Sequence, residues 1–152
     1  MTKREQAIAY FKEGYNCAQA VFMTFCDETG ADKKQAARIS APFGGGFGRQ
    51  REVCGAVSGM CMVLGVLYGC DDPTNGEAKL AHYAAVQEVC KRFRERCGGS
   101  IICRELIADD GRDTAPKPSA RTDAYYKKRP CTEIVGEAAD IMEGWLREHP
   151  IA

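Results

Sequence analysis

VCGAVSGMCMVLGVLYGC, residues 53–70, is a stretch of 18 positions without a charged side chain. A run of this length formally meets the criterion for a membrane-spanning helix. Gly55, Gly59, Gly65 and Gly69 interrupt it, however, and the segments on either side are amphipathic and need an apolar partner to cover. We therefore predict a buried central helix here, and no membrane insertion.

The segments around this stretch carry the start and stop signals of helices. These signals predict helices from Thr2 to Gly14, from Asn16 to Gly30, from Asp32 to Ser40, from Glu77 to Arg96, after Ser100, and from Pro130 to Pro150. No segment alternates as a strand would, and residues 109–128 are expected to form an exposed connection. The sequence thus predicts an all-α fold, a compact single domain over residues 1–152 with about six or seven helices around the glycine-rich central helix.

Composition excludes several classes of partner. Lys and Arg number 21, Asp and Glu also number 21, and the formal net charge is zero. Such a chain lacks the basic footprint expected of a protein that binds nucleic acid or an anionic membrane. The charged N-terminus, Met1 to Gln6, has no hydrophobic signal region. We expect a cytoplasmic protein whose thiols are reduced, with a small ligand, a metal or another protein as its partner.

The nine cysteines do not form a familiar sequence motif. Nine is an odd number, and no two of them are spaced as C-x-x-C. A full disulfide framework, a zinc ribbon and covalent attachment of haem through a c-type signature are therefore not indicated.

The predicted helices divide the cysteines into two groups. One group falls in the first turn of a helix, where free N–H groups and the helix dipole favour a thiolate: Cys17, Cys54, Cys103 and Cys131. We expect each of these thiols to ionise more readily than a free thiol. The other group falls in helix interiors or at C-terminal ends, where we expect small buried hydrophobes: Cys26, Cys61, Cys70, Cys90 and Cys97.

Four motifs together resemble a known family. They are NCAQAV at 16–21, FGGGFGR at 43–49, CGAVSG at 54–59 followed by MVLG at 62–65, and CREL at 103–106. In this order they resemble the prokaryotic C_GCAxxG_C_C family of redox-active proteins, over about residues 5–140. The resemblance implies a redox function and a site of four characteristic cysteines, here Cys17, Cys54, Cys103 and Cys131. It supplies a class of chemistry rather than a reaction.

Two kinds of redox site remain open. Four thiolates from four helix starts could ligate an iron–sulfur cluster or a tetrahedral metal ion. Backbone N–H groups near Gly44, Gly45, Gly46, Gly55 and Gly59 would then bind the cofactor, unless Gly55 and Gly59 only allow helices to pack closely. Alternatively, two of the thiols form a reversible disulfide without any metal. Arg49, Arg51 and Arg104 would favour the thiolate, unless they are ordinary solvated charges.

A third hypothesis needs no redox chemistry. The chain would be a helical interaction module with structural cysteines, using the helix around Trp145 as the face of a homodimer. In that case replacing Cys17 and Cys54 by Ser should change stability alone. Under either redox hypothesis an electron-transfer partner must exist, and the sequence does not identify it. His82 and His149 are expected to be ordinary surface or helix residues.

Overall fold

A computed structural model describes residues 1–151, with only the backbone described at residue 109. Regular structure in these residues is helical, and the nearest approach to a sheet is an isolated antiparallel bridge between Val53 and Ile102. The predicted all-α class is confirmed. None of the helices formed by these residues is both long enough and apolar enough to cross a membrane.

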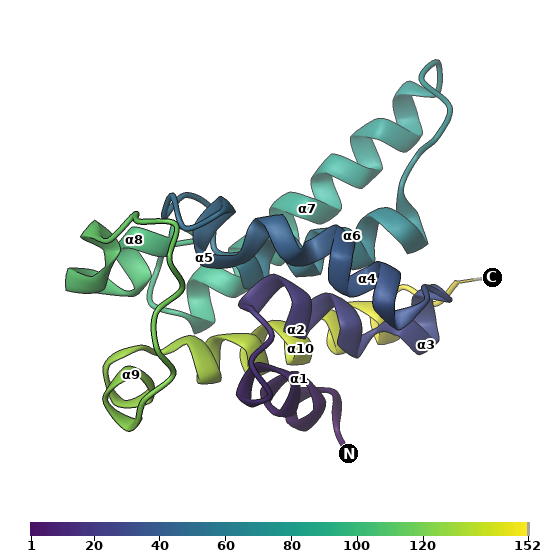
Figure 1. The fold of residues 1–152 in the computed structure, drawn as a ribbon. Helices are drawn as coiled ribbons and strands as arrows, with labels where there is room; N and C mark the ends of the chain where they lie inside the picture. Colours follow the sequence, from purple (N-terminus) through teal and green to yellow (C-terminus); the bar gives the residue numbers. More distant parts are fainter. Residues whose placement is uncertain (152) are drawn as a thin grey trace.

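The helices follow one another with short connections (Figure 1). The longer elements are α1 (Lys3–Lys12), α2 (Cys17–Thr24), α4 (Lys33–Ser40), α6 (Gly55–Tyr68), α7 (Gly76–Arg96) and α10 (Cys131–Glu148). The shorter ones are α3 (Cys26–Thr29), η1 (Ala41–Phe43), α5 (Gly44–Phe47), α8 (Cys103–Leu106), η2 (Ala108–Arg112) and α9 (Asp123–Lys128).

The predicted central helix is α6, which contacts α2, α7 and α10. Ala56, Met60, Val63 and Leu64 on α6 are fully buried, whereas Val66 near its C-terminal end is 52% exposed. The helix is therefore the centre of the bundle along most of its length, as the uncharged sequence indicates, and reaches the surface at its end.

Capping residues set the starts of the first two major helices as predicted. Thr2 with Glu5 and Asn16 with Gln19 form reciprocal capping boxes at the starts of α1 and α2. The single helix expected from Asn16 to Gly30 is instead two, because the backbone of Phe25 is not helical (φ −107°, ψ 20°) and separates α2 from α3.

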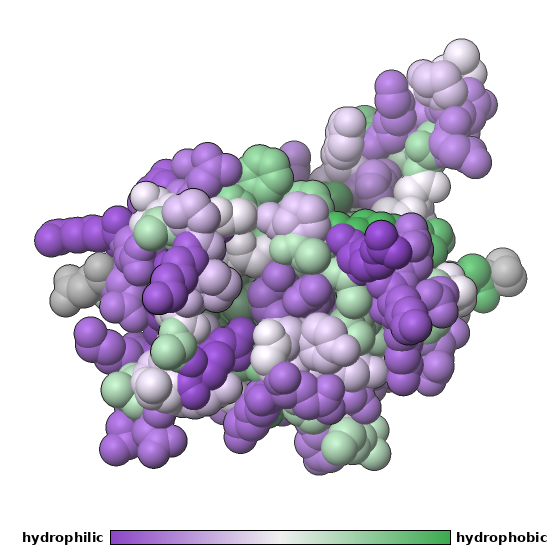
Figure 2. Space-filling view, in the orientation of Figure 1, coloured by the Kyte–Doolittle hydropathy of each residue, from purple (hydrophilic) through white to green (hydrophobic). Residues whose placement is uncertain are grey.

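The face of α10 that carries Trp145 is turned inward. Trp145 is 7% exposed, and its ring stacks on the ring of His149 at a centroid distance of 3.7 Å. The chain's own core covers this face, so Trp145 itself is not available as a contact for a second copy. Apolar residues are exposed elsewhere. The N-terminal half of α7 projects from the body of the protein (Figure 1), and Leu80 and Tyr83 on it are exposed. Apolar surface also lies at the base of this projection (Figure 2).

Replacing two glycines of α6 by alanine is expected to have opposite effects on the free energy of unfolding. A Cβ at Gly59 would lie 2.9 Å from the Ala18 carbonyl oxygen and 2.9 Å from Val21 Cβ, whereas a Cβ at Gly65 would meet nothing within 4 Å. We expect Gly59→Ala to lower the free energy of unfolding by about 1–3 kcal/mol through overpacking. Gly65→Ala should leave it unchanged or raise it by up to about 1 kcal/mol, because alanine favours the helix. Urea denaturation checks both, and equal effects would contradict the assigned α2–α6 contact.

Candidate functional site

Four helices begin with a cysteine or directly after one. Cys17, Cys103 and Cys131 are the first residues of α2, α8 and α10, and Cys54 is the N-cap of α6. The positions predicted for these four cysteines are therefore confirmed. No disulfide joins them, and they are free thiols in the structure.

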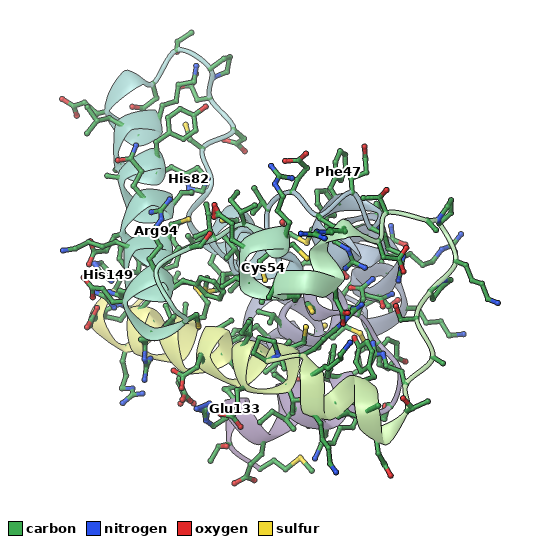
Figure 3. All side chains as sticks on the ribbon, turned by 90° about the vertical axis from the view of Figure 1, so that its left-hand side faces the viewer. Phe47, Cys54, His82, Arg94, Glu133 and His149 are labelled. Atoms are coloured by element: carbon green, nitrogen blue, oxygen red, sulfur yellow. The ribbon has the colours of Figure 1, made fainter. Side chains whose placement is uncertain are left out.

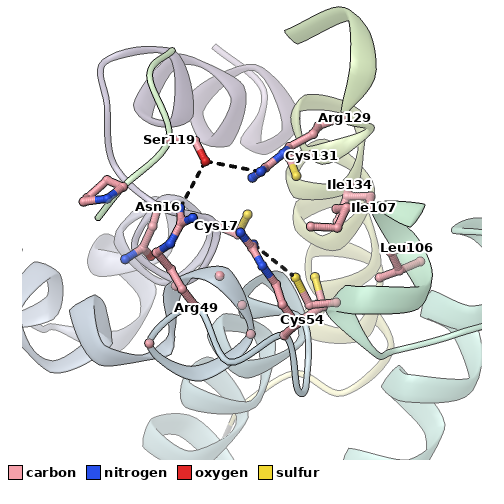
Figure 4. Close-up of a pocket in the computed structure, with 18 of the residues that line it drawn as sticks. Asn16, Cys17, Arg49, Cys54, Leu106, Ile107, Ser119, Arg129, Cys131 and Ile134 are labelled. Atoms are coloured by element: carbon pink, nitrogen blue, oxygen red, sulfur yellow. Dashed lines mark hydrogen bonds between the residues drawn. The ribbon is translucent and has the colours of Figure 1, made fainter. Parts of the chain in front are cut away.

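The four cysteines line one cavity of about 300 Å³, together with Gly44, Gly45, Gly46 and Gly55. The cavity lies at the end of the bundle where Figure 1 shows α5, α8 and α9, and Figure 3 views this end with Cys54 near its centre. Figure 4 shows Cys17, Cys54 and Cys131 around a shared space. The structure thus brings the predicted residues together from four distant stretches of chain.

Backbone hydrogen bonds hold two of the cysteines in place. The Cys54 N–H donates to the Ile101 carbonyl oxygen, and the Cys103 N–H donates to the Glu52 carbonyl oxygen, each at 2.7 Å. These bonds flank the bridge between Val53 and Ile102. Backbone hydrogen bonds alone therefore hold the start of α6 next to the start of α8.

The glycine-rich loop is packed directly against the cysteines. A Cβ at Gly46 would lie 2.6 Å from Cys103 Cβ, and a Cβ at Gly55 would lie 3.2 Å from Cys17 Cβ. Gly46 also has a left-handed backbone (φ 70°), which favours glycine. Gly59 does not line the cavity and lies at the contact between α2 and α6, so its close-packing interpretation is the one that the structure supports.

Burial, not the helix dipole, has the largest effect on the pKa of two of these thiols. Burial raises the pKa of Cys54 to about 12, although the N–H groups of Ala56 and Val57 lower it. Burial also raises the pKa of Cys103, against the opposing effect of Arg51. The pKa of Cys17 is well above its ordinary value, first because its thiol donates a hydrogen bond to Cys131 and second because it is buried. The prediction that all four thiols ionise readily is wrong for these three.

Cys131 is the exception. The hydrogen bond from the Cys17 thiol lowers the pKa of Cys131, and the charges of Arg129, Arg121 and Arg51 lower it further, against the effect of burial. A thiolate is the nucleophile and the metal ligand in cysteine chemistry. Among the four cysteines of the cavity, the surroundings therefore favour the thiolate form at Cys131 alone.

Arginine side chains surround the cavity. Arg49 and Arg129 both donate to the Ser119 hydroxyl, at 3.1 and 3.3 Å (Figure 4), and Arg121 donates to the carbonyl oxygens of Phe11 and Tyr15. Residues 109–128, expected to be an exposed connection, thus supply part of the cavity wall. Arg129 was not predicted from the sequence. It lies two positions before Cys131, just as Arg51 lies shortly before Cys54, so its place next to a cysteine could have indicated it.

The two arginines nearest Cys54 and Cys103 in the predicted motifs behave differently. Arg51 is 2% exposed, and its Nη1 lies 3.8 Å from Cys103 Sγ. The interpretation of Arg51 as a solvated charge is therefore wrong. Arg104 does not line the cavity; its half-exposed side chain pairs with Glu52 and donates to the Arg51 carbonyl oxygen.

The remaining cysteines are mostly inert, with one pair that is not. Burial raises the pKa of Cys26 and raises that of Cys97 to about 11, in agreement with small hydrophobic residues. The neighbouring Cys61 thiol on α6, together with Arg94, lowers the pKa of Cys90 on α7 to about 7, although burial opposes this shift. Cys26 and Cys90 are buried as expected, whereas Cys61, Cys70 and Cys97 are only partly buried. The effect of Cys61 on Cys90 could not be predicted, because it depends on how α7 crosses α6.

A protein metal site needs several ligand side chains arranged around one point. In the part of the chain that the structure describes, no group of three or more His, Cys, Asp or Glu is arranged so that it could hold a metal ion. The four thiols share a cavity, but among the described residues they are not arranged as a set of metal ligands. His82 lies within α7, His149 is an exposed residue at the end of α10, as expected, and both lie away from Cys54 (Figure 3).

Comparison with known proteins identifies one relationship. A family model described as "Putative redox-active protein (C_GCAxxG_C_C)" matches residues 15–145. The match spans all four cysteines of the cavity. No curated protein and no solved structure matches the chain.

The lowering of the Cys131 pKa by Cys17 predicts a change in reactivity. Replacing Cys17 by Ala removes the donor, so the pKa of Cys131 should rise and its thiolate should form only at higher pH. Mass-spectrometric mapping of iodoacetamide alkylation across pH measures this for each cysteine. We expect the Cys131 profile to move to higher pH in Cys17→Ala and to stay in place in the control Cys26→Ala. An unmoved Cys131 profile in Cys17→Ala would contradict the assigned contact.

Proposed function

We propose that this chain, which belongs to the C_GCAxxG_C_C family of redox-active proteins, works by reversible thiol–disulfide exchange at the four-cysteine cavity. Cys131 is the attacking thiolate and Cys17 is the resolving thiol. The observation that carries the proposal is that both cysteines begin helices at the wall of the same cavity, where the pKa of Cys131 alone among the four is lowered, first by Cys17.

The reaction balances without a metal. The Cys131 thiolate attacks one sulfur of a disulfide RSSR, the S–S bond of that molecule breaks, and RS⁻ leaves and takes a proton from water. Cys17 then attacks Cys131 Sγ of the mixed disulfide, and the second RS⁻ leaves with the Cys17 proton. Two electrons pass from the two cysteines to RSSR, which becomes two RSH. The reverse sequence lets the protein oxidise a dithiol.

The other two cysteines suit a supporting role. Cys54 and Cys103 carry raised pKa values and stay protonated at neutral pH. They occupy the wall of the cavity beside the reactive pair, where their small thiols leave room for a substrate. The partner that supplies or accepts electrons is expected to be a disulfide or dithiol that reaches Cys131 through the side on which Cys17 is partly exposed.

Electron transfer through an iron–sulfur cluster or metal ion held by Cys17, Cys54, Cys103 and Cys131 is the competing redox proposal. Helix starts, backbone N–H groups and arginines would suit the negative charge of a thiolate-bound cluster. The residues present do not fit a metal ion as they stand, because the described side chains contain no arranged ligand group. The thiol proposal needs no such ligand group, and for that reason we favour it.

The test is oxidation of the reduced, anaerobically purified protein by hydroxyethyl disulfide. We expect the loss of two titratable thiols and a Cys17–Cys131 disulfide in peptide maps. Cys17→Ala should stop at a mixed disulfide on Cys131, because the resolving thiol is missing. Cys26→Ala is the matched control, since it removes a buried cysteine outside the cavity and should oxidise as the unaltered protein does.

Three outcomes would overturn the proposal. Stoichiometric iron with acid-labile sulfide in the purified protein, lost with Cys131→Ala, would select the cluster. Disulfide formation between cysteines other than Cys17 and Cys131 would displace the assigned roles. No reaction with disulfides, with Cys17→Ser and Cys54→Ser changing only the free energy of unfolding, would select a non-catalytic interaction module.

A further inference from the structure

The cavity contains a buried cation with an unused hydrogen-bond donor. Arg51 is 2% exposed, its Nε donates to the Asp113 carbonyl oxygen at 2.9 Å, and its Nη1 faces Cys103 Sγ at 3.8 Å. Its Nη2 is buried and has no hydrogen-bond partner among the described residues. Burying an unpaired donor of a charged group costs free energy, so an acceptor bound in the cavity beside this atom would be stabilised.

The surroundings of Arg51 carry an excess of positive charge. Four arginines line the cavity, Arg49, Arg51, Arg121 and Arg129, and none of the described lining residues is Asp or Glu. Two carboxylates approach from outside the lining: Asp113 pairs with Arg49 at 3.1 Å, and Asp110 pairs with Arg129 at 2.9 Å. Arg51 and Arg121 have no carboxylate partner in the described residues. A thiolate at Cys131 would offset one of these two charges and leave a guanidinium without an acidic partner of its own among the described residues.

These arginines are held in place before any ligand arrives. Ser119 accepts from both Arg49 and Arg129 (Figure 4). Arg121 lies over the Phe11 ring at 4.2 Å and over the Tyr125 ring at 5.1 Å, while donating to two carbonyl oxygens. A preorganised set of guanidinium groups binds an anion with little loss of side-chain entropy.

We infer that the cavity takes small disulfides and thiols that carry a negatively charged carboxylate close to the sulfur, and that Arg51 Nη2 binds this carboxylate while the sulfur meets Cys131. The inference rests on the proposed thiol–disulfide function and names its substrate class. A cavity of about 300 Å³ suits a small molecule. A guanidinium matches the planar carboxylate group in shape as well as in charge.

Three reagents that differ in charge test the inference. Dithiodipropionate is a dianion, hydroxyethyl disulfide is neutral and cystamine is a dication, and all three place a polar group two carbons from the sulfur. The second-order rate of protein oxidation by each is divided by the rate at which the same reagent oxidises free cysteine. We expect the normalised rate to be about tenfold higher for dithiodipropionate than for hydroxyethyl disulfide, as one charged hydrogen bond would give, and lowest for cystamine.

Variants at Arg51 assign this preference to one side chain. Arg51→Gln should remove the tenfold preference, and Arg51→Lys should keep part of it because the charge remains. The readout is the ratio of two rates, since Arg51 also lowers the pKa of Cys131 and its loss slows reaction with every reagent. Arg38→Gln, on the exposed face of α4 and outside the cavity, is the matched control and should keep the full preference. If Arg51→Gln does not fold, as judged by circular dichroism, Arg51→Lys and Arg129→Gln carry the test.

The outcomes separate this inference from the function on which it rests. If hydroxyethyl disulfide oxidises the protein but dithiodipropionate gains no advantage, the thiol–disulfide function stands and the substrate class is wrong. An advantage that survives in Arg51→Gln, or that disappears in Arg38→Gln, would likewise overturn the role of Arg51. If none of the three reagents oxidises the protein, the proposed function itself fails.

Discussion

The cavity depends on two glycines, Gly46 and Gly55, because at these positions there is no room for a side chain. Gly55 lets the start of α6 approach Cys17 and the start of α2, and Gly46 lets the loop before α6 lie against Cys103. Any Cβ at Gly46 would come within 3.0 Å of the Cys103 side chain and of neighbouring backbone, a distance that packed atoms do not tolerate. Four helix starts converge because glycine leaves the space in which they meet.

That convergence creates an electrostatic conflict. Helix starts favour a thiolate, but the same close packing that brings the cysteines together removes water and disfavours charge. In three of the four thiols burial, or a hydrogen bond donated to another sulfur, has the larger effect and the pKa rises. Only Cys131 has a donor thiol and three arginine charges acting together. A single thiolate beside a protonated neighbour is the arrangement that nucleophilic attack followed by resolution requires.

Local signals in the sequence were enough to place the helices and the cysteines on them. The capping residues Thr2 and Asn16 and the uncharged run before Cys70 gave the fold class, because such signals act within a few residues. The wall formed by Ser119, Arg121 and Arg129 could not be predicted, since it depends on how an irregular segment docks on α1. The burial of Arg51 was missed for a related reason: a charged residue is assigned to the surface unless its partners are known.

The most direct measurement of the central claim is the ¹³Cβ chemical shift of each cysteine in the reduced protein and after equilibration with an excess of disulfide. These shifts distinguish a thiol from a disulfide residue by residue, in the intact protein and without trapping reagents. The account predicts that Cys17 and Cys131 move together to disulfide values while Cys54 and Cys103 keep thiol values. A disulfide signature at any other pair, or thiol values at both Cys17 and Cys131 under oxidising conditions, would contradict it.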